Sequence, residues 1–354
     1  MRLNIDRRFS KRALRVTPGA LAACLVLAAS IHHLSAVSRS ASGRSEIVAS
    51  FPVGSQPEGI AMSPSGTLYV GNRLARETTV VNQVLMIDRV GTATVFAELP
   101  DSSPEAEGLL GLAVDPSGTL FAAFASSDAN HGVWRISRDG LRVQRMAGSE
   151  AIAFPNAITF DSRGRLYVTD SFGGAIWRSV RTGGFDLWLA DELLSPLADD
   201  PLGFPLPGAN GIAFYRPNLL YVANTERGLI ARVEILHDGR AGVPTAVTAP
   251  FAVPTVDGIA VDIHGHVHAA LPGFALFGAA PLVRVDPSTG TVTPTVVDSV
   301  DLTRFDSPLS LVFGSGRWDV RTVLVTNGDL PVVPGGPGPG VVQVDVGVPG
   351  FPVP

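Results

Sequence analysis

Four short stretches of the chain each place one carboxyl or amide side chain directly before an apolar run: Glu58, Asn156, Asn210 and Asp257. Carboxylate and amide oxygens are the ligands that hard cations prefer, and the set contains no His or Cys. If the fold brings the four together, they would suit Ca²⁺, with Mg²⁺ or Mn²⁺ as alternatives. Water or substrate would complete the coordination. Taken singly, each of these residues could instead stabilise a turn by forming a hydrogen bond to a backbone group of that turn.

The four residues occupy one register of an internal repeat. Its pattern is Gly-apolar-Ala-apolar, a short polar turn, and then Gly-x-apolar-aromatic-apolar. Copies begin at Gly59, Gly111, Ala157, Gly211, Gly258 and, more loosely, at Ser310. A period near 50 residues made only of short strands and turns predicts a β-propeller with six blades.

Each copy contains four segments that are typical of strands. The sixth copy is the exception, because the chain ends before its fourth strand. The segment Glu46–Phe51 can supply that strand from the other end. We therefore predict an all-β fold over residues 46–350. It is a six-bladed β-propeller of four-stranded blades, with a ring closed by the N-terminal strand that hides both sheet edges.

In a propeller the first strand of each blade lies nearest the axis. The residue before that strand should stand at one mouth of the central channel. The six such residues are Glu58, Leu110, Asn156, Asn210, Asp257 and Leu309. Four of the six offer oxygen, which predicts an open metal site on the axis.

Long connections, among them Gly71–Asn82 and Leu99–Leu110, are predicted as loops on the same face as this mouth. Elaborated loops around one mouth are typical of a binding face. His131 lies in another such connection and is a candidate substrate-binding residue or accessory base. The apolar stretches Leu202–Pro207 and Leu271–Phe277 are expected to form a pocket wall or lid.

The cluster His264, His266 and His268 has spacing typical of a zinc site. It falls in a turn between the first two strands of a blade, on the face away from the metal mouth. We therefore interpret it as a turn and strand with solvated histidines.

Residues 1–45 are typical of a signal peptide, or of an uncleaved N-terminal anchor with a linker. Basic residues precede an apolar run, Ala20–Ile31, which is short for a membrane span. A secreted or periplasmic protein is expected, with anchoring to the membrane by the uncleaved segment as the alternative.

Composition excludes several classes of chemistry. Residues 1–45 carry eight Lys and Arg against one acid, which leaves the remaining chain a formal charge of −12. Such a charge disfavours nucleic acid or anionic membrane as a partner and leaves a small-molecule substrate. The only Cys and the only Lys are Cys24 and Lys11, so the body after residue 45 has no thiol nucleophile, disulfide, Schiff-base lysine or Walker-type phosphate loop.

With the four oxygen residues in order Glu, Asn, Asn, Asp, the chain resembles the family of senescence marker protein, gluconolactonase and luciferin-regenerating enzyme. The matching motifs are Pro57-Glu58-Gly59, Pro155-Asn156, Asn210-Gly211-Ile212 and Asp257 to Asp262. The resemblance implies a divalent metal held by the four residues and hydrolysis of a lactone or related ester. It makes Asp257 both a metal ligand and the general base, and Arg73 the nearest candidate for a polar substrate contact.

Our first hypothesis is thus a metal-dependent hydrolase of a lactone or small ester. The alternative is a non-catalytic propeller that binds a ligand or protein, with Ca²⁺ as a structural ion. A condensing enzyme similar to strictosidine synthase is a third possibility, and Glu107 is its only candidate for the pocket Glu.

Overall fold

The computed structural model describes residues 43–104, 106–181, 183–197, 206–328, 330 and 336–352. The leader predicted over residues 1–45 thus lies almost wholly outside the described residues, as does most of the apolar stretch Leu202–Pro207. No helix within the described ranges is long and apolar enough to cross a membrane.

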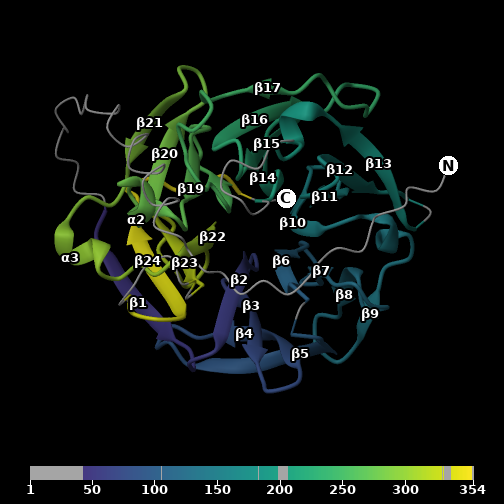
Figure 1. The fold of residues 1–354 in the computed structure, drawn as a ribbon, viewed down its shortest axis with the longest axis horizontal. Coiled ribbons are helices and arrows are strands. Elements are labelled where there is room, and N and C mark those ends of the chain that lie inside the picture. Colours follow the sequence, from purple (N-terminus) through teal and green to yellow (C-terminus); the bar gives the residue numbers. More distant parts are fainter. Residues whose placement is uncertain are drawn as a thin grey trace, which may run out of the picture. The chain divides into compact units, whose positions relative to one another are not determined.

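Six four-stranded antiparallel sheets surround a common axis as the blades of a β-propeller (Figure 1). The innermost strands are β2 (Ser55–Met62), β6 (Gly108–Val114), β10 (Pro155–Phe160), β14 (Ala209–Tyr215), β18 (Ile259–Val261) and β22 (Pro308–Phe313). The second strands are β3 (Leu68–Ala75), β7 (Leu120–Ala125), β11 (Leu166–Asp170), β15 (Leu219–Asn224), β19 (Val267–Ala270) and β23 (Thr322–Asn327). The predicted fold class is confirmed.

The outer strands follow the same order. The third strands are β4 (Val80–Ile87), β8 (Gly132–Ile136), β12 (Ala175–Ser179), β16 (Leu229–Glu234), β20 (Leu282–Asp286) and β24 (Gly340–Asp345). The fourth strands are β5 (Ala93–Ser102), β9 (Val143–Arg145), β13 (Phe185–Ala190), β17 (Thr245–Ala246), β21 (Thr291–Pro294) and β1 (Ser45–Ser50). Only short helices interrupt them: η1 (Ser149–Ala151), η2 (Glu192–Leu194), α2 (Phe274–Phe277) and α3 (Ser299–Leu302).

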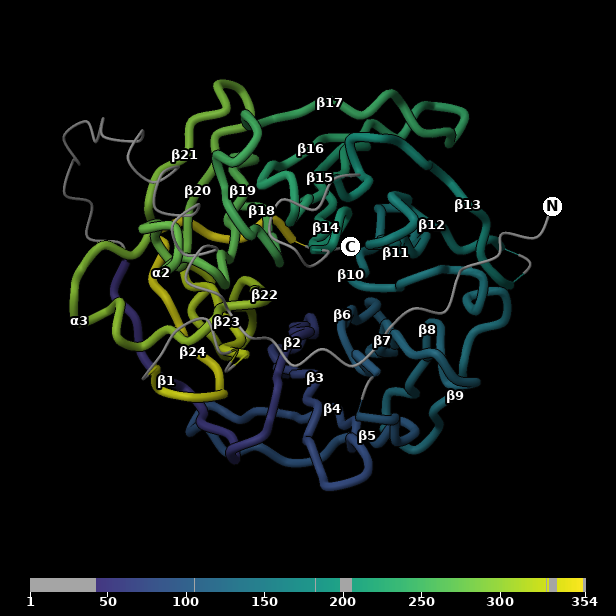
Figure 2. The backbone as a smooth tube through the Cα atoms, in the orientation of Figure 1, coloured from purple at the N-terminus to yellow at the C-terminus, as the bar shows by residue number. Residues whose placement is uncertain are grey.

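The ring closes through β1, which is the outermost strand of the last blade. It pairs antiparallel with β24 from Ser45 opposite Val344 to Ser50 opposite Gly340. Figure 2 shows the purple N-terminal strand beside the yellow C-terminal strand. Because β1 covers the edge of β24, the two ends of the chain hold the ring together and leave no gap in the last blade.

Apolar side chains fill the space between neighbouring blades. Leu68 and Val70 of the first blade pack with Leu324 of the last, and Leu120 and Phe124 of the second blade pack with Ala61 and Tyr69 of the first. Burying one such aliphatic or aromatic side chain stabilises the fold by ~1.5–3 kcal/mol. The rigid ring that results fixes the positions of the innermost strands.

Turns between the first two strands of several blades are held by the carboxylate that directly follows the first strand. Asp115 Oδ1 accepts from the backbone N–H groups of Ser117 and Thr119, at 2.9 Å each. Asp262 Oδ1 accepts in the same way from His264 and His266, at 2.8 and 3.0 Å. The histidine cluster is therefore part of a recurring turn.

The prediction that these histidines are solvated is wrong for His268, which is 1% exposed. Asp262 Oδ2 lies 3.2 Å from both His268 Nε2 and His266 Nδ1. Burial alone would raise the pKa of Asp262, but hydrogen bonds from His268 and from the backbone of His266 outweigh it and lower the pKa to about 2. Burial lowers the pKa of His268, an effect that Asp262 only partly offsets.

The first blade differs from the prediction in two of the connections expected beside the channel mouth. Gly71–Asn82 and Leu99–Leu110 were expected as loops, yet β3 runs to Ala75, β4 starts at Val80 and β5 runs to Ser102. Polar side chains inside these strands find partners. Asn82 Nδ2 donates to Val80 O, Pro100 O and Ser102 Oγ, and Asn82 Oδ1 accepts from Leu109 N. The first blade therefore extends further than the others beside the channel mouth.

Candidate metal centre on the propeller axis

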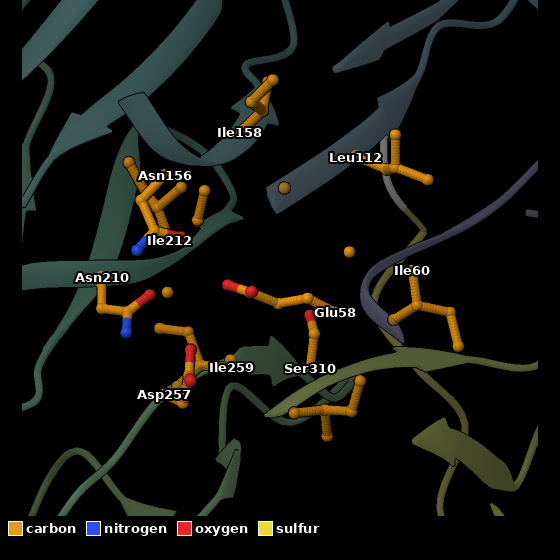
Figure 3. Close-up of a pocket in the computed structure, with 16 residues that line it drawn as sticks. Glu58, Ile60, Leu112, Asn156, Ile158, Asn210, Ile212, Asp257, Ile259 and Ser310 are labelled. Atoms are coloured by element: carbon orange, nitrogen blue, oxygen red, sulfur yellow. The ribbon is translucent and has the colours of Figure 1, made fainter. Parts of the chain in front are cut away.

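The innermost strands bring the four oxygen-bearing residues to one small axial cavity of about 80 Å³. Figure 3 shows the oxygen atoms of Glu58, Asn156, Asn210 and Asp257 directed toward the same space. A volume of this size holds an ion with a few waters, since a cavity of roughly 10–15 Å³ is enough for one water. A whole substrate would have to lie above the cavity and reach into it.

The predicted mouth residues Leu110 and Leu309 do not line this cavity; both side chains are buried. The next layer of the channel is aliphatic instead. It consists of the residues two places after each mouth position: Ile60, Leu112, Ile158, Ile212, Ile259 and Leu311. This apolar layer leaves the polar oxygens in a poorly solvated setting.

Close packing of the innermost strands explains the small residue after each mouth position. A Cβ atom on Gly59 would collide with the carbonyl oxygen of Leu110, and one on Gly211 with that of Asp257. In addition, Gly211 N donates to Asp257 O at 3.2 Å. Glycine in the repeat therefore lets each innermost strand touch the next, which brings the mouth residues together.

The two carboxylates influence each other. Burial raises the pKa of Glu58 to about 7. The positive charge of Arg73 opposes this increase, and the negative charge of Glu107 adds to it. Burial and the charge of Glu58 hold the pKa of Asp257 well above its usual range, and a hydrogen bond from the Asn210 side chain lowers it in part. Two carboxyl groups held close together with little solvent disfavour negative charge and would gain from a bound cation.

The two amides present oxygen to the cavity because their nitrogens are engaged elsewhere. Asn156 Nδ2 donates to Ser171 Oγ at 3.1 Å, and Asn210 Nδ2 donates to Thr225 Oγ1 at 3.0 Å. Asn210 Oδ1 is buried and has no hydrogen-bond partner among the described residues. A buried acceptor without a partner is costly, so this oxygen is available to coordinate a cation.

These residues fit a divalent cation, although no group of three or more His, Cys, Asp or Glu side chains with metal-binding geometry occurs in the described ranges. The set that we consider has two carboxylates and two amides. Oxygen ligands of this kind suit Ca²⁺, Mg²⁺ or Mn²⁺.

Arg73 and Glu107 stand together near this mouth. Arg73 Nη1 lies 3.1 Å from Glu107 Oε2, and the Arg73 side chain is 14% exposed while that of Glu107 is 55% exposed. Arg73 Nε is buried without a hydrogen-bond partner among the described residues. The structure thus leaves one donor of Arg73 unused close to the carboxylate of Glu58.

Both ring nitrogens of His131 are engaged by backbone groups. Its Nδ1 accepts from Ser126 N at 3.1 Å, and its Nε2 lies 2.6 Å from the carbonyl oxygen of Ile152. It does not line the axial cavity. In this arrangement neither ring nitrogen is free to act on a substrate.

Three residues near the cavity were not singled out from the sequence: Ser171, Thr225 and Ser310. Ser171 and Thr225 each follow their asparagine by 15 residues, a constant interval that could have revealed them. Arg73 follows Glu58 by the same interval. Ser310 lines the cavity at the position that Gly occupies in four of the other five copies.

No family model and no curated protein matches the chain by sequence. Solved structures do match it. A gluconolactonase from Xanthomonas campestris aligns with a TM-score of 0.57 and 17% identity, over 86% of this chain and 88% of that one. A luciferin-regenerating enzyme aligns with a TM-score of 0.60 and 14% identity, over 84% and 94%. The calcium-binding protein regucalcin from Agrobacterium tumefaciens aligns with a TM-score of 0.60 and 16% identity, over 86% and 93%. The chain therefore shares its propeller fold with these proteins along nearly their whole length.

Proposed function

We propose that the protein is a metal-dependent hydrolase of a lactone or small ester, related to the gluconolactonases and regucalcin. One observation carries the proposal: two carboxylates and two amides from four separate blades direct their oxygens into one cavity, where Asn210 Oδ1 is buried and unpartnered. A scaffold has no need of this arrangement, since each group adds a desolvation cost.

Glu58, Asn156, Asn210 and Asp257 would hold the cation. When bound, the cation supplies a Lewis acid that polarises the substrate carbonyl and stabilises negative charge on its oxygen. Calcium is the first candidate because the ligands are all oxygen, and a regucalcin described as calcium-binding shares the fold.

Asp257 would act as the general base. Its carboxylate faces the cavity and can take a proton from the water that attacks the carbonyl. Arg73, with its free Nε donor, would bind and orient the polar part of the substrate above the cavity. The aliphatic layer beside the oxygens keeps bulk water out and strengthens these electrostatic interactions.

The test combines metal analysis with assays on a panel of lactones and esters, using wild type and Asp257→Ala. The proposal expects wild type to bind one divalent ion and to turn over a member of the panel, and Asp257→Ala to lose turnover. If Asp257→Ala keeps both metal and turnover, this mechanism is wrong. If wild type binds metal but hydrolyses nothing, the chain is a binding propeller with a structural ion.

A further inference from the structure

We propose that Ser171 and Thr225 are positioning residues that fix the amide oxygens of Asn156 and Asn210 toward the channel axis. The inference rests on the proposed metal site and assigns the groups that orient two of its four ligands. Both residues directly follow the second strand of their blade, Ser171 after β11 and Thr225 after β15. Both are buried.

The donors and acceptors around Ser171 leave only one arrangement. Ser171 Oγ lies 2.8 Å from the carbonyl oxygen of Ala209 and 3.1 Å from the side-chain nitrogen of Asn156. A carbonyl oxygen only accepts, and a serine hydroxyl has a single proton to donate. That proton goes to Ala209, so Ser171 Oγ must accept from Asn156. The amide group of Asn156 therefore turns its NH₂ to Ser171 and its oxygen to the cavity.

The next blade repeats the arrangement. Thr225 Oγ1 donates to the carbonyl oxygen of Val256 at 2.7 Å and accepts from Asn210 Nδ2 at 3.0 Å. By the same reasoning the amide oxygen of Asn210 faces the cavity, where it has no partner. Without the hydroxyl, the Asn156 amide could rotate by half a turn and present N–H donors, which a cation repels. The Asn210 amide would be held only by its other hydrogen bond, to Asp257.

The two carbonyls that accept these protons stand directly before the next ligand. Ala209 precedes Asn210, and Val256 precedes Asp257. The hydrogen bonds thus run from Asn156 through Ser171 to the backbone beside Asn210, and from Asn210 through Thr225 to the backbone beside Asp257. Each hydroxyl orients one ligand and ties it to the strand that carries the next.

The first blade has no hydroxyl 15 residues after its ligand, and this difference suits the ligand. Glu58 is a carboxylate and has no amide to orient, and the residue 15 places after it is Arg73. A cationic side chain stands where the third and fourth blades have a hydroxyl, and its charge opposes the rise in the pKa of Glu58. In the first, third and fourth blades, the residue at this register therefore suits the chemistry of the ligand beside it.

Calorimetric titration of the full chain with Ca²⁺ tests the inference without any need for activity. Outer-shell groups of this kind change metal affinity by about 10-fold to 100-fold when they are lost. Ser171→Ala should weaken Ca²⁺ binding within that range. Thr225→Val, which keeps the shape but removes the hydroxyl, should weaken it less, because Asp257 also accepts from the Asn210 side chain.

Two controls separate orientation from general damage. Thr225→Ser keeps the hydroxyl and should bind Ca²⁺ as wild type does. Ser149→Ala removes another buried hydroxyl, which bonds only the backbone of Val133 and Met146, away from the axial cavity. It should lower thermal stability and leave Ca²⁺ affinity unchanged.

Wild-type affinity in both Ser171→Ala and Thr225→Val would overturn the inference and leave the metal site standing. If Ser171→Ala does not fold, equal Ca²⁺ affinities of Thr225→Val and Thr225→Ser would be enough to overturn the inference. If wild type binds none of Ca²⁺, Mg²⁺ and Mn²⁺, the proposed function fails first and this inference falls with it.

Discussion

The carboxylates of Glu58 and Asp257 come from the first and fifth blades and share one small cavity, where the charge of Glu58 helps to raise the pKa of Asp257. Holding two carboxyl groups in this position costs free energy, because each disfavours ionisation of the other. Proteins keep such arrangements where function requires them.

Replacing Asp257 by Asn should separate function from stability. If Asp257 is the general base, Asp257→Asn should lower the rate of ester or lactone hydrolysis by about 10²-fold to 10⁴-fold. A raised carboxyl pKa means that folding costs free energy above the ordinary pKa of the group. At pH 8 in chelator, the variant should therefore unfold at a higher temperature than wild type. Asp238→Asn, which changes an exposed carboxylate paired with Arg240, should alter neither the hydrolysis rate nor the unfolding temperature. An Asp257→Asn variant that unfolds at a lower temperature than wild type would contradict the account.

Arg73 should govern substrate affinity. Arg73→Met removes the unpartnered Nε donor and the charge beside Glu58. A lost hydrogen bond to a charged donor costs about 1.5–3 kcal/mol, which corresponds to a rise in KM of roughly 10-fold to 100-fold. Glu107→Gln keeps Arg73 in place and should have a smaller effect. Steady-state kinetics on both variants at saturating metal would show the difference, and an unchanged KM in Arg73→Met would remove Arg73 from the substrate site.

The closing strand should be sensitive to charge at the buried Ala49 and not at the exposed Ile47. Ala49 is 4% exposed in the apolar packing between the last and first blades, while Ile47 of the same strand is 42% exposed. Ala49→Asp buries an unpaired carboxylate and should lower the free energy of unfolding by about 3 kcal/mol or more. Ile47→Asp should change it by about 0.5 kcal/mol or less. Urea denaturation measures both, and similar losses in the two variants would show that β1 does not close the ring as described.

Acid should destabilise the fold through Asp262 and His268. The pKa of Asp262 is lowered to about 2 from 3.8, so its contribution is complete above pH 4 and is lost as the pH falls toward 2. The pKa of His268 is lowered from 6.5, so the unfolded chain takes up a proton first and stability begins to fall below that pH. Urea midpoints between pH 7 and pH 3 should fall for wild type. Asp262→Asn should start from a lower midpoint and change less below pH 4, whereas a parallel decline in the two proteins would refute this assignment.

The repeat made much of this architecture predictable. A small residue recurs where innermost strands touch. The spacing of Gly59, Gly111, Gly211 and Gly258, with Ala157 and Ser310 at the two remaining positions, therefore gives the number and order of blades. The extended strands of the first blade could not be foreseen in the same way. Asn72 and Asn82 are typical of loops, and only the tertiary structure supplies the partners that let them lie buried inside strands.

The candidate site could likewise be predicted only in part. The register placed Glu58, Asn156, Asn210 and Asp257 before one type of strand, and strand geometry then carries them to one cavity. Ser171 and Thr225, which carry the orienting hydroxyls, directly follow a different strand and look like ordinary strand-end residues. Only the constant interval of 15 residues after each asparagine marks them in the sequence. That interval does not reveal that their hydrogen bonds cross from one blade to the next.

The central claim is that these four residues hold one divalent cation, and anomalous diffraction from crystals of the full chain grown with Mn²⁺ tests it most directly. We predict a single strong peak on the propeller axis, about 2.0–2.6 Å from oxygen atoms of Glu58, Asn156, Asn210 and Asp257. The peak should be absent in crystals of a variant that combines Glu58→Gln with Asp257→Asn. No axial peak in wild type, or an unchanged peak in the double variant, would contradict the account.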